Sequence, residues 1–404
     1  MSDHTGSGAD FRHADARQLA GALRDARHYT LALFDALAAE GYDRAHNVPR
    51  IGIVNPPLWE LGHTAWFAEW FVLREAVGSS PGDASGHSLL ARGDDWFDSG
   101  TVAHASRWTL DLPAPGAVKT YCHEVLDRIL DRLAREPDDD AALYPYRLAL
   151  AHEDMHGEAF LYTLQTLSGA APVPVGGAAA PGAPRPAADE IPFAGGSFLR
   201  GGDQSRGFVF DNEKLAAVRR VAPFAIDAHP VDNGAFLAFM RAGGYQNPGF
   251  WSDAGRAWLM GQERCAPRYW EREGDAWIVR RFGRKVALDL DEPVRHVNLH
   301  EAQAWCAWAG RRLPAEDEWE FAATADEPRF AWGQVWEWTA SHFLPYEGFV
   351  PDLYRDYSAP WFGSRQVLRG ASFATPARLR SPRFRNFYMP GRDDIFAGFR
   401  SCAL

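Results

Sequence analysis

Two histidines, His152 and His156, stand four residues apart in the stretch LALAHEDMHGEAFLYTLQ, residues 148–165. Residues at this spacing share one face of a helix, about 5–6 Å apart, so their imidazoles can converge on one metal ion. Apolar residues flank the pair, which indicates that this face looks into a bundle of helices. A pair of core histidines that bind neighbouring carbonyls has the same pattern, so the pair alone leaves both readings open.

A third histidine favours the metal. His63 lies in NPPLWELGHTAWFAEWFVLR, residues 55–74, inside a second helical and aromatic stretch. Metal sites in helix bundles are built from side chains on facing helices. Three neutral nitrogens that leave coordination positions open suit Zn²⁺ as a Lewis acid or Fe²⁺ as an activator of O₂, and spacing does not separate these two.

The segment HEDMH also matches the outline HExxH of zinc peptidases, in which the Glu is a general base. Here Glu153 would point about 100° away from His152 around the helix. No Glu or His occupies a convincing later position for the third ligand of such an enzyme. We therefore expect Glu153 to lie outside the ligand set, and a metal hydrolase is the least supported alternative.

Four helical segments precede residue 170 and must position these histidines. Apolar residues recur every three to four positions from Leu19 to Leu37, and again within a helix predicted at 117–135. A second helix is predicted from Asn55, as N-cap, to Gly78, and a fourth over 140–167 with a glycine just beyond its end. Four long helices predict a four-helix bundle over residues 1–170.

A change of composition separates this bundle from the rest. Residues 171–190 fall in a stretch of almost only Gly, Ala, Pro and Val, which predicts a linker. Beyond it, residues 191–404 are rich in Trp, Gly and Pro, with short predicted strands and two clear helices at 299–310 and 314–324. We therefore predict an α+β protein of two domains.

The composition of the chain limits the classes of partner that it could bind. The chain has 404 residues and a net charge of −11, from 42 Lys+Arg and 53 Asp+Glu, which argues against nucleic acid or an anionic membrane. No apolar run approaches the roughly 20 residues of a membrane span. The N-terminus has no apolar signal segment, and the four cysteines lack CxxC spacing, so a cytoplasmic protein with reduced thiols is predicted.

Four segments of the second half resemble the sulfatase-modifying, formylglycine-generating type of domain, a C-type-lectin-like fold. They are PVRHVNLHEAQAWCAWAGRRLPAEDEWEFAA, GQVWEWTAS, VLRGASF and AGFR, at 293–323, 333–341, 367–373 and 397–400. The oxidase branch of that family binds copper through a cysteine pair. Cys306 and Cys402 do not form the expected pair, so that activity is not implied here.

The whole chain resembles the ergothioneine-biosynthesis sulfoxide synthases, which join a DinB-like bundle carrying His…HxxxH to such a domain. The resemblance implies a non-haem Fe(II) held by His63, His152 and His156. It also implies a reaction in which O₂ is used to bond a chalcogen to C2 of the imidazole of hercynine, Nα-trimethylhistidine. The iron would then lie where the bundle faces the second domain.

Some positions depart from the synthases that couple cysteine or γ-glutamylcysteine. Those enzymes commonly have Gln before the second histidine of the pair, where this chain has Met155. After VWEWTAS they often have Tyr-x-x-Tyr, whose first Tyr donates a proton, and the pair here is Phe343 and Tyr346. The donor is then Tyr346, a water or the substrate. With PPLWELGHTAWF and DDWFDSGTVAHASRW, these departures make the chain resemble the selenoneine synthases, which join hercynine to a selenosugar.

The substrate pocket is implied at RNFYMPGRDDIFAGFR, residues 385–400. Asn386, Phe387 and Arg392 match pocket residues of the family, and Tyr388 stands where a residue that holds the thiol substrate is found. The quaternary ammonium of hercynine is best bound by aromatic faces, for which Phe387, Tyr388 and Tyr346 are candidates. Core packing for the aromatics and a structural ion pair for Arg392 are the alternatives.

The resulting hypothesis is an Fe(II)- and O₂-dependent enzyme that forms a C–Se bond between hercynine and a selenosugar. The first alternative is a C–S bond-forming synthase that uses cysteine or γ-glutamylcysteine. The second is a non-catalytic, lectin-like binding protein on a metal-stabilised bundle. All three have small molecules as partners.

Overall fold

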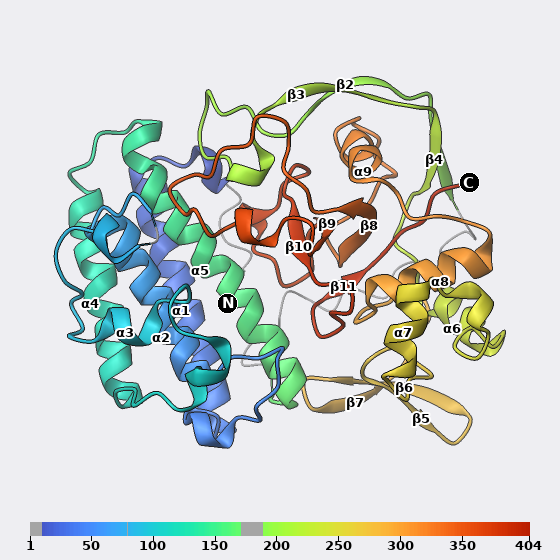
Figure 1. Ribbon diagram of the computed structural model, residues 1–404, viewed down its shortest axis with the longest axis horizontal. Helices are drawn as coiled ribbons and strands as arrows, with labels where there is room; N and C mark the ends of the chain where they lie inside the picture. The colour runs from blue at the N-terminus through green and yellow to red at the C-terminus, as the bar shows by residue number, and fades with distance from the viewer. Residues whose placement is uncertain (1–9, 79, 171–188) are drawn as a thin grey trace.

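The computed structural model describes residues 10–78, 80–170 and 189–404, which form two domains lying side by side (Figure 1). The N-terminal domain is a bundle of helices, and the C-terminal domain combines short sheets with helices. The predicted α+β class with two domains is confirmed. The predicted linker lies almost entirely outside the described residues.

Four long helices make up the bundle, and the first and third follow the apolar periods of their sequences. They are α1 (Ala16–Ala39), α2 (Pro57–Ala68), α4 (Pro115–Leu133) and α5 (Asp140–Leu167). Asp15 caps α1 and Asp139 caps α5 through their side chains, because a carboxylate satisfies the free N–H groups of a first turn. The predicted bounds of the fourth helix are confirmed, and those of the third are two residues too late at both ends.

The prediction for the second helix was wrong at both ends. Pro56, not Asn55, is the N-cap of α2, and the Asn55 side chain instead accepts a hydrogen bond from Arg107 (2.7 Å). After Ala68 the chain continues as a π-helical turn, Glu69–Leu73. The Glu69 carboxylate is buried at this turn. Such turns are frequent near functional sites.

Short elements complete the bundle domain. They are α3 (Gly93–Phe97) and the 3₁₀ helices Phe11–His13, Ala45–Asn47, Pro81–Asp83 and His104–Trp108.

The second domain is built around a four-stranded sheet in the order β10-β9-β8-β11, in which β11 runs parallel to β8 and the other pairs are antiparallel. Its strands are β8 (Trp336–His342), β9 (Gln366–Gly370), β10 (Asn386–Tyr388) and β11 (Ala397–Gly398). Smaller antiparallel sheets pair β1 (Glu190–Phe193) with β4 (Phe224–Asp227), β2 (Gly196–Arg200) with β3 (Ala217–Val221), and join β5 (Trp270–Glu273), β6 (Ala276–Arg281) and β7 (Arg284–Ala287).

Helices pack around these sheets. They are α6 (Asn233–Arg241), α7 (Asp253–Met260), α8 (Leu299–Ala309) and α9 (Glu316–Ala323), with 3₁₀ helices at Asp211–Glu213, Pro248–Phe250, Ala359–Trp361 and Ala377–Leu379. The two helices predicted from sequence in this half are α8 and α9, and both are confirmed.

Buried polar contacts hold α5 against the second domain. The Glu158 carboxylate accepts hydrogen bonds from Trp336 Nε1 (2.8 Å) and Ser372 Oγ (2.6 Å). Arg378 binds Asp154 through two nitrogens, at 2.6 and 2.8 Å. One apolar cluster runs through both domains. The second domain therefore packs directly against the helix that carries two of the three histidines (Figure 1).

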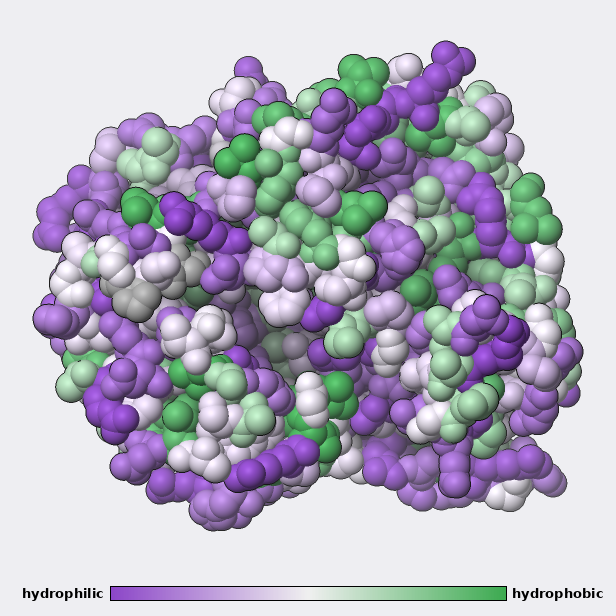
Figure 2. All heavy atoms as spheres, in the orientation of Figure 1, coloured by the Kyte–Doolittle hydropathy of each residue, from purple (hydrophilic) through white to green (hydrophobic). Residues whose placement is uncertain are grey.

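The face of the molecule in Figure 2 is mixed, with hydrophilic residues around small, separate hydrophobic patches. Among the described residues, no helix is both long and apolar enough to span a lipid bilayer.

Candidate metal centre and its cavity

The structure brings the three predicted histidines together. His63 comes from α2, and His152 and His156 come from α5, with one potential ligand atom of each within 4.8 Å of the others. The ring centroids are 5.0 Å apart between His63 and each of the other two, and 4.5 Å apart within the pair. The helical spacing puts the pair on one face, and the packing of α2 on α5 adds the third ring.

Hydrogen bonds orient two of the rings. His63 Nδ1 lies 2.8 Å from the carbonyl oxygen of Phe97, and His156 Nδ1 lies 2.8 Å from Glu60 Oε1. Both partners are acceptors, so each Nδ1 carries the proton and each Nε2 keeps its lone pair for a metal. A Cβ at Gly62 would stand 2.2 Å from the Phe97 ring, so the close approach that brings this carbonyl to His63 requires glycine.

The third ring, His152, is buried and its Nδ1 has no hydrogen-bond partner among the described residues. The ring stacks on Phe67, with centroids 3.5 Å apart. Burial lowers the pKa of both His63 and His152 well below the ordinary value, and the nearby His156 adds to this. Both rings are therefore neutral, and each can offer a lone pair to a metal. Three neutral imidazoles fit a divalent transition metal.

Glu153, the acid of the HEDMH segment, faces the bundle interior. Its Oε2 lies 3.1 Å from Arg27 Nη2, and burial raises its pKa. It does not line the cavity beside the histidines. In a zinc peptidase this glutamate is the general base. Here it lies outside the site, so the site lacks that base.

The three histidines open onto a cavity of about 270 Å³ between the bundle and the second domain. Both domains supply its wall, which is mostly aromatic. The aromatic lining residues are Trp59, Tyr162, Tyr354, Tyr357, Trp361 and Tyr388. Clefts between domains that combine aromatic walls with a few polar groups are common ligand sites.

Two charged side chains line this cavity, Arg107 and Asp356. Neither forms an ion pair with a described residue. Arg107 lies 3.7 Å from the centre of the Trp59 ring and binds Asn55 and the Val102 carbonyl. Burial lowers its pKa to about 10, against the opposing effect of the Glu60 carboxylate. Both charges are therefore available to a ligand.

Tyr354 and Tyr357 are site residues that the sequence analysis missed. Both line the cavity, and the Tyr354 ring lies 6.2 Å from the His152 ring. Burial raises the pKa of Tyr354 to about 12, so its hydroxyl keeps its proton at neutral pH. The missed signal is the Tyr-x-x-Tyr in LYRDYS, which lies further beyond VWEWTAS than the Phe343-x-x-Tyr346 segment on which the prediction of Tyr346 rested.

Of the predicted substrate residues, Tyr388 lines the cavity. Arg392 lies behind it, 5.3 Å from the Tyr388 ring centre, and binds Asp394 through two nitrogens at 2.6 and 2.8 Å. Its charge is therefore paired within the protein. Asn386 and Phe387 do not line the cavity. Phe387 stacks on Phe343 with centroids 4.1 Å apart.

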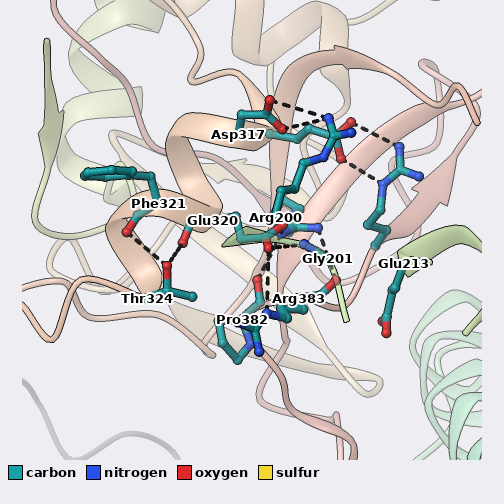
Figure 3. Close-up of polar contacts among 12 residues, drawn as sticks. Arg200, Gly201, Glu213, Asp317, Glu320, Phe321, Thr324, Pro382 and Arg383 are labelled. Atoms are coloured by element: carbon teal, nitrogen blue, oxygen red, sulfur yellow. Dashed lines mark hydrogen bonds and ion pairs between the residues drawn. The ribbon is translucent and has the colours of Figure 1, made fainter. Parts of the chain in front are cut away.

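Tyr346 also lies outside the lining of the cavity. It is buried between the guanidinium groups of Arg200 and Arg385, which lie 3.6 and 3.9 Å from its ring centre, and its hydroxyl is 3.3 Å from Glu316. Figure 3 shows part of this ion-pair cluster, with Arg200 directed at Asp317. The cluster belongs to the packing of the second domain and is absent from the cavity lining.

Cys306 and Cys402 are both buried and free, and neither lines the cavity.

Comparisons with known proteins agree with both domains. Residues 22–164 match the model of the DinB superfamily, and residues 177–334 and 331–403 match the sulfatase-modifying factor enzyme 1-like domain. A hercynine oxygenase of Mycolicibacterium thermoresistibile is 34% identical over 435 residues, covering 95% of this chain and 94% of the relative. The hercynine oxygenase of Mycobacterium tuberculosis is 34% identical, covering 95% and 98%.

A further relative, ergothioneine biosynthesis protein 1 of Schizosaccharomyces pombe, is 28% identical and covers 48% of this chain and 27% of its own length. Identity at this level over nearly the whole length of the two bacterial enzymes extends beyond either domain alone. The chain, with its DinB bundle and its sulfatase-modifying-factor domain, therefore belongs to the family of the hercynine oxygenases and is an oxidoreductase.

Proposed function

We propose that this protein is an Fe(II)- and O₂-dependent enzyme that bonds the selenium of a selenosugar to C2 of the imidazole of hercynine. His63, His152 and His156 would hold the iron, which supplies O₂ activation when bound. The cavity beside them, with walls from both domains, would hold the two organic substrates.

The charged side chains that line the cavity are the observation that supports this choice of substrates. Arg107 and Asp356 supply one free cation and one free anion, and the described lining residues include no other charged side chain. Hercynine carries one carboxylate and one trimethylammonium group, which match this pair. A second charged amino-acid substrate would need further partners, and Arg392 is already bound to Asp394. A sugar has no carboxylate or ammonium group, so such a donor brings no second pair of amino-acid charges into the cavity.

The residues of the chain then have distinct tasks. The Arg107 guanidinium binds the carboxylate of hercynine, and aromatic faces bind its trimethylammonium group, at about 0.5–2 kcal/mol for each face. Tyr354 holds a protonated hydroxyl toward the cavity and can donate that proton to a reacting group. Packing of the second domain over the cavity limits the access of bulk water.

A C–S bond-forming synthase that uses cysteine or γ-glutamylcysteine is the second candidate. The name of the Schizosaccharomyces pombe relative, ergothioneine biosynthesis protein 1, favours it. It shares the iron, O₂ and hercynine with the first candidate and differs in the donor alone.

One competition experiment separates the candidates. The protein is reconstituted with Fe(II) without oxygen and then given O₂, hercynine and equal amounts of a selenosugar, cysteine and γ-glutamylcysteine. We expect O₂ uptake and a hercynine–selenium product by mass spectrometry. A dominant sulfur product would establish the second candidate. Binding of hercynine with no O₂ uptake for any donor would favour the lectin-like binding protein and overturn both.

Two tyrosine variants test the proton donor. Tyr354→Phe should lower turnover by about 10²–10⁴-fold, the usual contribution of a general acid, with hercynine binding retained. Tyr346→Phe is the matched control, because this hydroxyl lies in the ion-pair cluster and outside the cavity. The opposite order of effects would return the role to Tyr346.

A further inference from the structure

Met155 places a thioether in the same cavity as the three histidines. It precedes His156 and lies three residues after His152, so all three share one face of α5. Its side chain lines the cavity and is half-buried. The hydroxyl of Tyr357 lies 3.8 Å from its sulfur. A soft, oxidisable sulfur atom therefore shares a confined space with the candidate iron.

The other described methionines lie elsewhere. Met260 and Met389 are 87% and 54% exposed, and Met240 packs against the core of the second domain. None of these three lines the cavity. An oxidant dissolved in the buffer would attack the exposed sulfurs first, because methionine oxidation follows exposure. Chemistry at the metal would reach Met155 first, so the order of oxidation identifies where the oxidant arises.

We propose that Met155 is an oxidative modification site, converted to the sulfoxide when O₂ is reduced at the metal centre in the absence of hercynine. This inference depends on the proposed binding of iron. In the step, the O–O bond of O₂ breaks and one oxygen atom forms an S=O bond with the thioether, which loses two electrons. The other oxygen leaves as water, with two electrons and two protons from a reductant such as ascorbate.

The modification would change the wall of the cavity. The apolar sulfur becomes a polar, chiral group with a strong acceptor oxygen. That oxygen accepts hydrogen bonds, as the carbonyl oxygen of a Gln side chain does. Met155→Gln is therefore a permanent mimic of the sulfoxide.

The test uses full-length protein loaded with Fe(II), and the same protein loaded with Zn²⁺ as a control without redox chemistry. Both are incubated with ascorbate and isotopically labelled O₂, and peptide mass spectrometry measures oxidation at Met155, Met260 and Met389. Metal analysis confirms occupancy. In the iron protein, Met155 should gain a labelled oxygen before either exposed methionine, whereas in the zinc protein it should lag behind both. Hercynine should protect Met155 by occupying the cavity.

Two variants add a functional readout. Each protein is compared with its own activity before the incubation. The wild type should lose activity in step with the oxidation of Met155, and Met155→Leu should resist this loss. Met155→Gln, which carries a polar acceptor from the start, should show the reduced activity of the oxidised wild type before any incubation.

Three results would overturn the inference. If iron is bound and Met155 stays reduced while the exposed methionines oxidise, the modification site is wrong and the proposed function stands. If no iron is bound, both fail together. Equal oxidation of Met155 in the zinc protein would also reject the inference, because it would show that the oxidant comes from solution.

Discussion

The contact between Glu60 and His156 allows the metal centre to be tested by a residue that binds no metal itself. Glu60 is 1% exposed, and the hydrogen bond from His156 Nδ1 (2.8 Å) is the one that orients this ring. The carboxylate fixes the tautomer and makes Nε2 a stronger donor to a metal. Replacing it should weaken metal binding with all three ligands still present.

The expected loss of metal affinity depends on which properties of the Glu60 carboxylate each replacement keeps. Loss of such a partner typically reduces metal affinity by about 10–100-fold, or about 1.4–2.8 kcal/mol. Glu60→Gln keeps an oxygen acceptor without the charge, so we expect a loss of about tenfold. Glu60→Leu removes the acceptor at a buried position where water does not replace it, so we expect about 100-fold.

The assay is an anaerobic competition for Fe(II) between the protein and a coloured chelator. Glu69→Gln is the control, because Glu69 is equally buried but binds Tyr121 and the Leu89 backbone instead of the histidines. It should lower the free energy of unfolding and leave the Fe(II) affinity of the folded protein unchanged. If Glu60→Leu binds Fe(II) as tightly as the wild type, the reasoning about ring orientation is wrong.

Two further predictions concern stability. Arg378→Met leaves the buried Asp154 carboxylate without its partner and should lower the free energy of unfolding by about 3–5 kcal/mol in urea titrations. Arg329→Met, at an exposed ion pair, should leave it unchanged. A small effect at Arg378 would mean that the domains do not depend on this contact. Burial raises the pKa of Asp211 from 3.8 to about 6. The protonated acid thus favours the folded state, and this contribution is complete below about pH 3.8 and lost as the pH rises through about 6. The stability of Asp211→Asn relative to the wild type should rise by up to about 3 kcal/mol between about pH 4 and pH 7, and a flat difference would contradict the assignment.

The bundle was predictable because its signals are local. The apolar period from Leu19 to Leu37 and the spacing of His152 and His156 depend on the geometry of one helix. The start of α2 was not predictable in this way. Asn55 has the side chain of a good N-cap, but a long-range bond from Arg107 engages it, and Pro56 takes the capping position.

The candidate site was likewise predictable only where its signals are local. Residue type and helical spacing alone determined which histidines could meet. Rings at positions i and i+4 lie on the same side of a helix, and few side chains in the interior of a bundle could serve as a third ligand. Only the tertiary structure decided which tyrosines reach them. Tyr354 begins a Tyr-x-x-Tyr segment and Tyr346 ends a Phe-x-x-Tyr segment of the same region, yet the loop over residues 354–361 packs across α5 while Tyr346 is held in an arginine cluster. Such contacts join residues some 200 positions apart, as between Tyr357 and Met155, and no local pattern encodes them.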